Sequence, residues 1–161
     1  MTGERPSAAR AIVVGGLVAG TLDLLFAVLV YGYARGGSED DVLHSIASGW
    51  LGRTAFAGGG PSSVLGFFTQ YLIALGAAAV FFVVSGAFPV LRRRPVPAGL
   101  AFGAGLYAFM YGVVMPLSAI PFRPSFAAPK GLLPALTAHM ILIGLPIALC
   151  ARYFGGVRGA L

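Results

Sequence analysis

Four long apolar segments, separated by short polar stretches, fill most of the chain. A helix rises about 1.5 Å per residue, so about 20 apolar residues cross a hydrocarbon core of roughly 30 Å. Runs of this length without period-two alternation can satisfy their backbone hydrogen bonds in lipid only as helices. The pattern predicts an all-α polytopic membrane protein whose transmembrane helices form an up-down bundle, with the four spans at residues 11–33, 62–88, 96–117 and 132–153.

A shorter amphipathic helix is predicted between the first two spans, at residues 39–51. Ser38 is a favourable N-cap, and Asp41 follows it at the capping-box spacing. The apolar residues recur at spacings of four and eight, which places them on one helical face, and the helix is too short to cross a membrane. We therefore expect it to lie flat on the outer surface or to cap the mouth of the bundle.

The composition agrees with a membrane protein. Of the 161 residues, 58% are hydrophobic and 10% are charged, and the mean hydropathy is +0.88; a soluble domain usually has about 25% charged residues. Residues 1–161 are expected to form a single membrane domain. The formal charge of +6 comes from basic residues at the segment ends, without a basic face, so nucleic acid is not an expected partner.

The basic residues also predict the orientation of the chain. Lys and Arg are enriched in cytoplasmic loops. Seven basic residues fall on the side that holds both termini and four on the other side: Arg5, Arg10, Arg92, Arg93, Arg94, Arg152 and Arg158, against Arg35, Arg53, Arg123 and Lys130. Both termini are therefore expected in the cytoplasm.

A tandem two-helix repeat is a second hypothesis about organisation, with halves at residues 11–88 and 96–153. The segment RTAFA at 53–57 resembles RPSFA at 123–127, and similar small-residue patterns follow each of them. Such halves would be related by an axis along the membrane normal.

Asp23 is the only acid in the apolar segments. It lies on a stripe of small residues, as do Gln70, Tyr107, Tyr111 and His139. Small residues let helices approach in lipid, so these stripes are expected to face protein. Counted from the outer ends of the spans, Asp23, Gln70, Tyr111 and His139 fall in the outer half of the membrane. We predict a buried polar layer in which Asp23 meets His139, Gln70 or a tyrosine hydroxyl. It would act as a proton or ion relay, as the floor of a polar pocket, or as a hydrogen-bonded clamp between helices.

Other chemistry has little support in the sequence. His44 and His139 lie in different environments, so no metal site is predicted, and no cofactor motif is present. The single cysteine, Cys150, excludes a disulfide within one chain. Arg53 and Arg123, near outer helix ends, are candidate contacts for an anion or a lipid head group, with solvated interfacial arginines as the alternative.

Four segments resemble a group of small four-helix bacterial inner-membrane proteins. They are AGTLDLLFA at 19–27, VLHSIASG at 42–49, AFAGG at 55–59 and PLSAIPF at 116–122. In size and hydropathy the chain is also similar to YagU-type inner-membrane proteins. The resemblance implies a bacterial inner-membrane location and four spans, and it assigns no activity and no site residue.

The first functional hypothesis is a non-catalytic accessory or scaffold subunit that packs through glycine-rich helix faces, with the lipid bilayer, a homo-oligomer or a larger membrane complex as its partners. The alternative is a small oligomeric transporter or channel that uses the Asp/His polar layer. A lipid-modifying membrane enzyme is the third hypothesis, and the absence of a catalytic motif makes enzymatic activity the less favoured expectation.

Overall fold

The computed structural model describes residues 7–122 and 129–156, and these residues form helices without a strand. Four helices are long and apolar enough to cross a membrane, at Ala8–Arg35, Gly59–Ala87, Pro95–Leu117 and Leu133–Gly155. The ranges agree with the predicted spans to within a few residues at each end. The all-helical class and the four long apolar helices are thus confirmed.

Three of the long helices contain a π-helical segment. The first long helix comprises α1 (Ala8–Ala27), the first π segment (Val28–Gly32) and a 3₁₀ turn (Tyr33–Arg35). The second is α3 (Gly59–Ala87). The third comprises α5 (Pro95–Phe109), the second π segment (Met110–Val114) and α6 (Met115–Leu117). The fourth comprises α7 (Pro129–Ala138), the third π segment (His139–Gly144) and α8 (Leu145–Gly155). The connections include α2 (Glu39–Leu51), a 3₁₀ segment (Gly52–Ala57) and α4 (Val90–Arg93).

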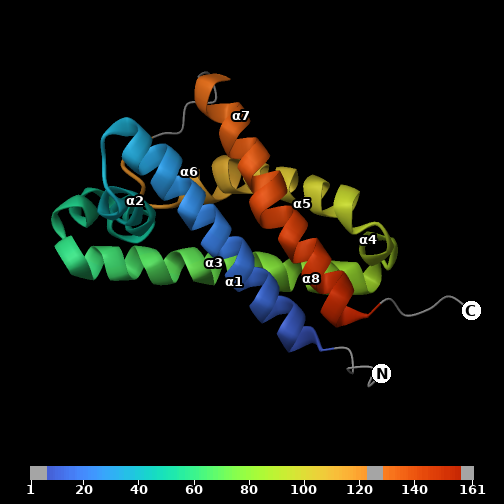
Figure 1. Ribbon diagram of the computed structural model, residues 1–161. Helices are drawn as coiled ribbons and strands as arrows, with labels where there is room; N and C mark the ends of the chain where they lie inside the picture. Colours follow the sequence, from blue (N-terminus) through green and yellow to red (C-terminus); the bar gives the residue numbers. More distant parts are fainter. Residues whose placement is uncertain (1–6, 123–128, 157–161) are drawn as a thin grey trace, which may run out of the picture.

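The helices pack closely where glycines face a neighbour. α1 lies between α3 and α8, and α5 packs against α8 and the third π segment. Figure 1 shows α1 and α8 crossing α3 obliquely. A Cβ added at Gly16 would lie 2.9 Å from the Cα of Leu75, and one added at Gly99 would lie 2.9 Å from the Cα of Leu145. Only glycine permits these backbone approaches.

The start of α1, the end of α8 and α4 meet at one end of the molecule, called here the terminal end. The Ser7 N–H donates to the Phe154 carbonyl at 2.8 Å, and Arg152 Nη1 donates to the Arg93 carbonyl at 3.2 Å. Figure 1 shows the start of α1 and the end of α8 on this side of the molecule. The opposite end is called the α2 end, where the Ala119 N–H donates to the Gly49 carbonyl at 2.9 Å.

Arg92 joins two helix ends at the terminal end. Its Nε donates to Ser85 Oγ at 2.8 Å, Nη2 donates to the Phe82 carbonyl at 3.0 Å, and Nη1 donates to the Gly155 carbonyl at 3.2 Å. The carbonyls near a helix C-terminus carry partial negative charge, which favours a cation there. Arg92, one of the basic residues that predict the orientation of the chain, is therefore also a clamp between α3 and α8.

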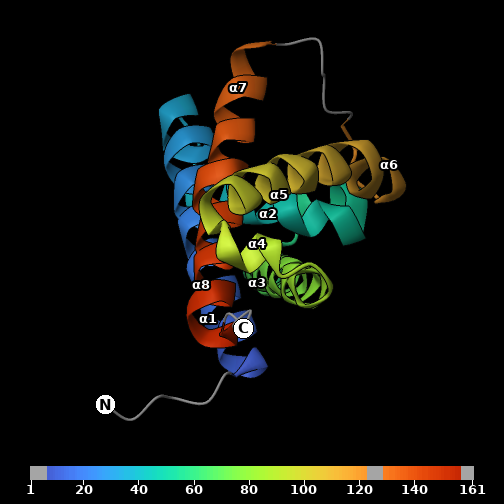
Figure 2. The ribbon, with the colours of Figure 1, turned by 90° about the vertical axis from the view of Figure 1, so that its right-hand side faces the viewer.

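At the α2 end, α2 begins with the predicted capping box. The Asp41 N–H donates to Ser38 Oγ at 3.3 Å, and the Ser38 N–H donates to Asp41 Oδ2 at 2.8 Å. Asp41 Oδ2 accepts from both the Ser38 N–H and, at 2.9 Å, Ser38 Oγ. These two hydrogen bonds stabilise the carboxylate and lower the pKa of Asp41. α2 is seen end-on in Figure 1 and lengthwise in Figure 2, whereas α3 is lengthwise in Figure 1 and end-on in Figure 2. The short helix therefore crosses α3 steeply.

Candidate functional site

The acid of the first long helix pairs with an amide. Gln70 Nε2, on α3, donates to Asp23 Oδ2, on α1, at 2.8 Å. The two backbones are close because Gly20 faces α3, where an added Cβ would lie 3.1 Å from the Cβ of Ala74. The sequence suggested His139, Gln70 or a tyrosine hydroxyl as the partner of Asp23. In the structure the partner is Gln70.

A second polar pair joins the same two helices. Thr21 Oγ1 and Tyr71 Oη are hydrogen-bonded at 2.9 Å. Neither residue is among those predicted for the polar layer, although Thr21 lies two positions from Asp23 and Tyr71 lies next to Gln70. α1 and α3 are therefore joined by two side-chain hydrogen bonds at neighbouring positions.

The aromatic part of the predicted layer lies on α5 and the fourth helix. The rings of Tyr107 and Tyr111 have centroids 4.3 Å apart, and the Tyr107 ring meets His139 edge-to-face at 5.3 Å. Their helices touch at Gly103, where an added Cβ would lie 2.6 Å from the Cα of Met140. The structure thus brings these three side chains together.

His139 does not bond to Asp23 in the structure. Its Nδ1 lies 2.9 Å from the Ala135 carbonyl oxygen. Because a carbonyl oxygen only accepts, Nδ1 carries the proton, and Nε2 is the ring position that accepts when the imidazole is neutral. The contact to the preceding turn fixes the tautomer at the start of the third π segment.

The two halves of the layer are within electrostatic reach of each other. Tyr111 contacts Tyr107 and lies within electrostatic range of Tyr31 and Asp23. Tyr31, on the first π segment, was not among the predicted residues, and its position two helical turns after Asp23 is the signal that could have identified it. We call the group Asp23, Gln70, Tyr31, Tyr107, Tyr111 and His139 the polar layer.

Each π segment contributes a residue to the polar layer, and prolines account for two of the three segments. The second and third π segments end two residues before Pro116 and Pro146. Proline has no N–H, and its ring clashes with the carbonyl four residues earlier, which here belongs to Gly112 or Leu142. The wider turn relieves this conflict, and π turns recur at functional sites.

An apolar core lies beside the polar layer, toward the terminal end. Its buried members come from α1, α3, the third π segment and α8, and they are Ala19, Ala77, Ala78, Phe81, Ile143, Ile147, Ala148 and Ala151. Along each of α1 and α3 these residues lie between the polar layer and the terminal end. The apolar core therefore separates the polar layer from that end of the molecule.

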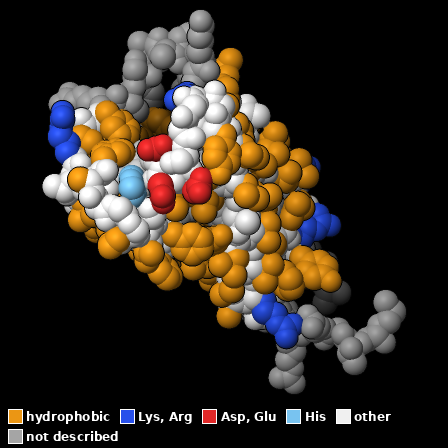
Figure 3. Space-filling view, turned by 60° about the vertical axis from the view of Figure 1, so that its left-hand side comes forward, with side chains coloured by type: hydrophobic (Ala, Val, Ile, Leu, Met, Phe, Trp, Pro, Cys, Tyr) orange, Lys and Arg blue, Asp and Glu red, His pale blue; other side chains and the backbone are white. Residues whose placement is uncertain are grey.

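A surface polar cluster lies at the α2 end. Ser63 Oγ donates to Asp40 Oδ1 at 2.5 Å and lies 3.0 Å from His44 Nε2, which is also 2.9 Å from the Gly59 carbonyl oxygen. Figure 3 shows acidic side chains gathered around a histidine. Since the Ser63 proton is directed to Asp40 and the Gly59 carbonyl requires a donor, His44 Nε2 carries a proton and is not a general base in this arrangement. The cluster is a set of hydrogen bonds that holds α2 against α3.

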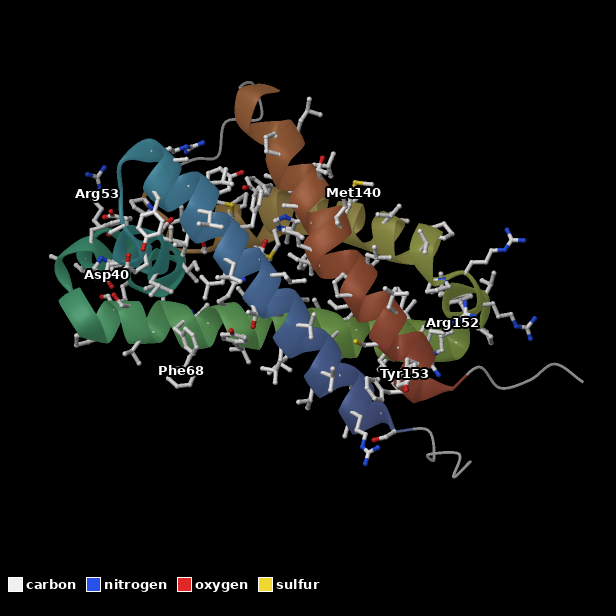
Figure 4. All side chains as sticks on the ribbon, in the orientation of Figure 1. Asp40, Arg53, Phe68, Met140, Arg152 and Tyr153 are labelled. Carbon is white, nitrogen blue, oxygen red and sulfur yellow. The ribbon has the colours of Figure 1, made fainter. Side chains whose placement is uncertain are left out.

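Of the two arginines proposed as anion contacts, the structure describes only Arg53. Arg53 is exposed in the 3₁₀ segment at the α2 end, as Figure 4 shows. Arg123 lies outside the described residues. Arg35, which was not proposed, stacks on the Tyr31 ring at 4.7 Å. Within residues 7–122 and 129–156 there is no group of three His, Cys, Asp or Glu side chains that could hold a metal ion.

Comparison with family models, with curated proteins and with solved structures finds no match for the chain.

Proposed function

We propose that the chain is a multi-pass membrane protein whose four apolar helices cross the bilayer in up-down order. Large apolar side chains cover the outer face of α3, with Phe68, Leu72 and Val83 exposed by 66%, 64% and 70%. Figure 4 shows Phe68 directed away from the helix bundle. Exposed apolar patches of this kind are rare on soluble monomers and are expected on a helix face that contacts lipid. The hydrogen bonds that join Ser7 to Phe154 at the terminal end and Ala119 to Gly49 at the α2 end support the up-down order.

The excess of arginine at the terminal end supports a cytoplasmic position for both termini. The resemblance of four sequence segments to bacterial proteins supports the inner membrane as the location. The test uses a Cys150→Ser background that carries either Arg53→Cys or Arg94→Cys, with a membrane-impermeant maleimide applied to intact cells. Labelling at position 53 but not at position 94 is expected, and the reverse pattern would refute the orientation.

The polar layer supports a role in proton movement, so the protein acts as a small transporter or channel and forms a homo-oligomer. The observation that carries this proposal is the environment of Asp23, the only acid in the described long helices. Its hydrogen-bond partner is a neutral amide, and three π segments bring Tyr31, Tyr111 and His139 to the same layer. A charged side chain at mid-membrane costs at least about 2.5 kcal/mol, so intramembrane acids are retained mainly for function.

The apolar core lies between the polar layer and the terminal end, so a proton that crosses the membrane must also pass it. A proton that reaches Asp23 from the α2 end meets packed alanine, isoleucine and phenylalanine side chains on the way to the terminal end. Transfer across the membrane therefore requires a movement of the helices or a path between copies of the chain.

Proton flux into liposomes tests the proposed activity. The purified full-length protein is reconstituted with a pH-sensitive dye inside the vesicles, and a pH gradient is applied. The wild type and Asp40→Asn, which makes the same chemical change at the surface, are expected to conduct, whereas Asp23→Asn is expected to be inactive at equal helicity and incorporation. Equal flux through Asp23→Asn and the wild type would overturn the proposal.

The scaffold role that the sequence favours is the second candidate, and one observation supports it. Gly76 on α3, Gly105 on α5 and Gly112 on the second π segment have open space where a Cβ would point. Open glycine faces let a helix of another membrane protein approach closely. Recovery of a stoichiometric partner from native membranes, lost on Gly105→Leu, would favour the scaffold role.

A further inference from the structure

Three exposed arginines gather at the terminal end. Arg93 is the last residue of α4, Arg94 follows it, and Arg152 lies in the last turn of α8. The hydrogen bond from Arg152 Nη1 to the Arg93 carbonyl holds α8 against α4, so two segments that are far apart in sequence place their exposed arginines at the same end of the molecule. Figure 4 shows Arg152 beside α4 at this end of the molecule.

The described acidic residues do not offset these charges. Asp23 lies in α1, and Glu39, Asp40 and Asp41 lie in α2 at the opposite end. Arg92 has a different role, because its guanidinium is engaged by Ser85, Phe82 and Gly155. Like charges that are held together repel one another, and an anion bound among them removes that cost.

Exposed apolar side chains lie next to the arginines. Val90 and Val96 flank Arg93 and Arg94 in the chain and are exposed by 55% and 50%. Leu149 and Tyr153 adjoin Arg152 on α8 and are exposed by 44% and 81%. A surface with cationic groups beside apolar side chains matches an amphiphile with an anionic head.

We propose that Arg93, Arg94 and Arg152 bind the head group of an anionic phospholipid, with its acyl chains against Val90, Val96, Leu149 and Tyr153. Guanidinium groups donate paired hydrogen bonds to phosphate oxygens, and basic residues at a membrane surface attract anionic lipids. The site requires the terminal end to lie at the lipid surface, as the proposed membrane insertion implies. It does not depend on proton binding at Asp23.

The test measures lipid binding to the full-length protein in a neutral detergent. Phosphatidylglycerol and phosphatidylcholine with the same acyl chains are titrated, and bound lipid is counted by native mass spectrometry. The wild type is expected to retain phosphatidylglycerol selectively. Each arginine-to-glutamine change at the site is expected to weaken binding about fivefold, and the triple variant Arg93→Gln, Arg94→Gln, Arg152→Gln on the order of 100-fold.

Arg53→Gln is the matched control, because it removes an exposed arginine at the opposite end and is expected to leave binding unchanged. Equal binding of the two lipids, or equal losses in Arg53→Gln and Arg94→Gln, would overturn the site. Competition by inorganic phosphate at the concentration of the lipid would show a small-anion site in place of a lipid site. If the triple variant does not fold, the lipid binding of Arg94→Gln, compared with that of Arg53→Gln, tests the site. If proton flux is normal and every variant keeps the wild-type lipid selectivity, this inference is contradicted. The proposed function would then still stand.

Discussion

Replacing Gly103 with alanine should push apart the two helices that carry Tyr107 and His139. The added Cβ would lie 2.6 Å from the Cα of Met140, and ordinary contact begins at 3.4 Å, so restoring ordinary contact requires a displacement of about 0.8 Å. Backbone atoms cannot rotate away as a side chain can. Overpacking of this kind costs about 1 to 3 kcal/mol.

Gly105→Ala is the control for this substitution. It lies on the same helix, has open space at the Cβ position, and gains the same helix propensity, up to about 1 kcal/mol. The difference between the two variants therefore isolates the steric cost. Reversible unfolding in mixed micelles, followed by circular dichroism and by the reactivity of the single thiol of Cys150, should rank Gly103→Ala about 1 to 3 kcal/mol below Gly105→Ala. Equal stabilities would refute the close packing of α5 against the third π segment.

Two further predictions concern the ends of the molecule. Arg92→Gln should lower the free energy of unfolding by about 2 kcal/mol, because charged hydrogen bonds to helix-end carbonyls are lost. Arg93→Gln should change it by less than about 0.5 kcal/mol. Equal effects of the two substitutions in denaturant titrations would contradict the clamp. The folded-state pKa of Asp41 is lowered, so its contribution to stability is present above the ordinary pKa of the carboxyl and is lost as the pH falls through the lowered value. Asp41→Asn should therefore flatten the loss of stability as the pH falls below the ordinary carboxyl pKa of about 4, and an unchanged pH profile would refute the capping contribution.

The four long helices could be predicted because their signal is local. Each apolar run is long enough to cross a membrane, and the Ser38 and Asp41 pair marks the start of α2 without any tertiary information. The side of each helix that faces protein also followed from small residues, as the approach of Gly16 to Leu75 and of Gly103 to Met140 illustrates.

The partners within the polar layer could not be predicted, because they depend on the register between helices. Moving α1 by one turn relative to α3 would present a different residue to Asp23, and nothing local in the sequence fixes that position. His139 begins the third π segment, and its Nδ1 bonds to the Ala135 carbonyl in place of the acid. Pro146 was the available signal for the π segment.

The role of Arg92 was missed for a related reason. Three consecutive arginines predict a charged turn, and they do not show which of them turns inward to the ends of α3 and α8. The orientation of the chain, the tandem repeat and the activity stay predictions.

The most direct test of the central claim is an infrared difference spectrum of the protein in lipid, recorded between acid and alkaline pH. Proton binding at Asp23 predicts a carboxylic acid C=O band that changes with pH, is shifted by Gln70→Leu because the amide hydrogen bond is removed, and is absent from Asp23→Asn. A spectrum that is the same for the wild type and Asp23→Asn across the pH range would contradict the claim.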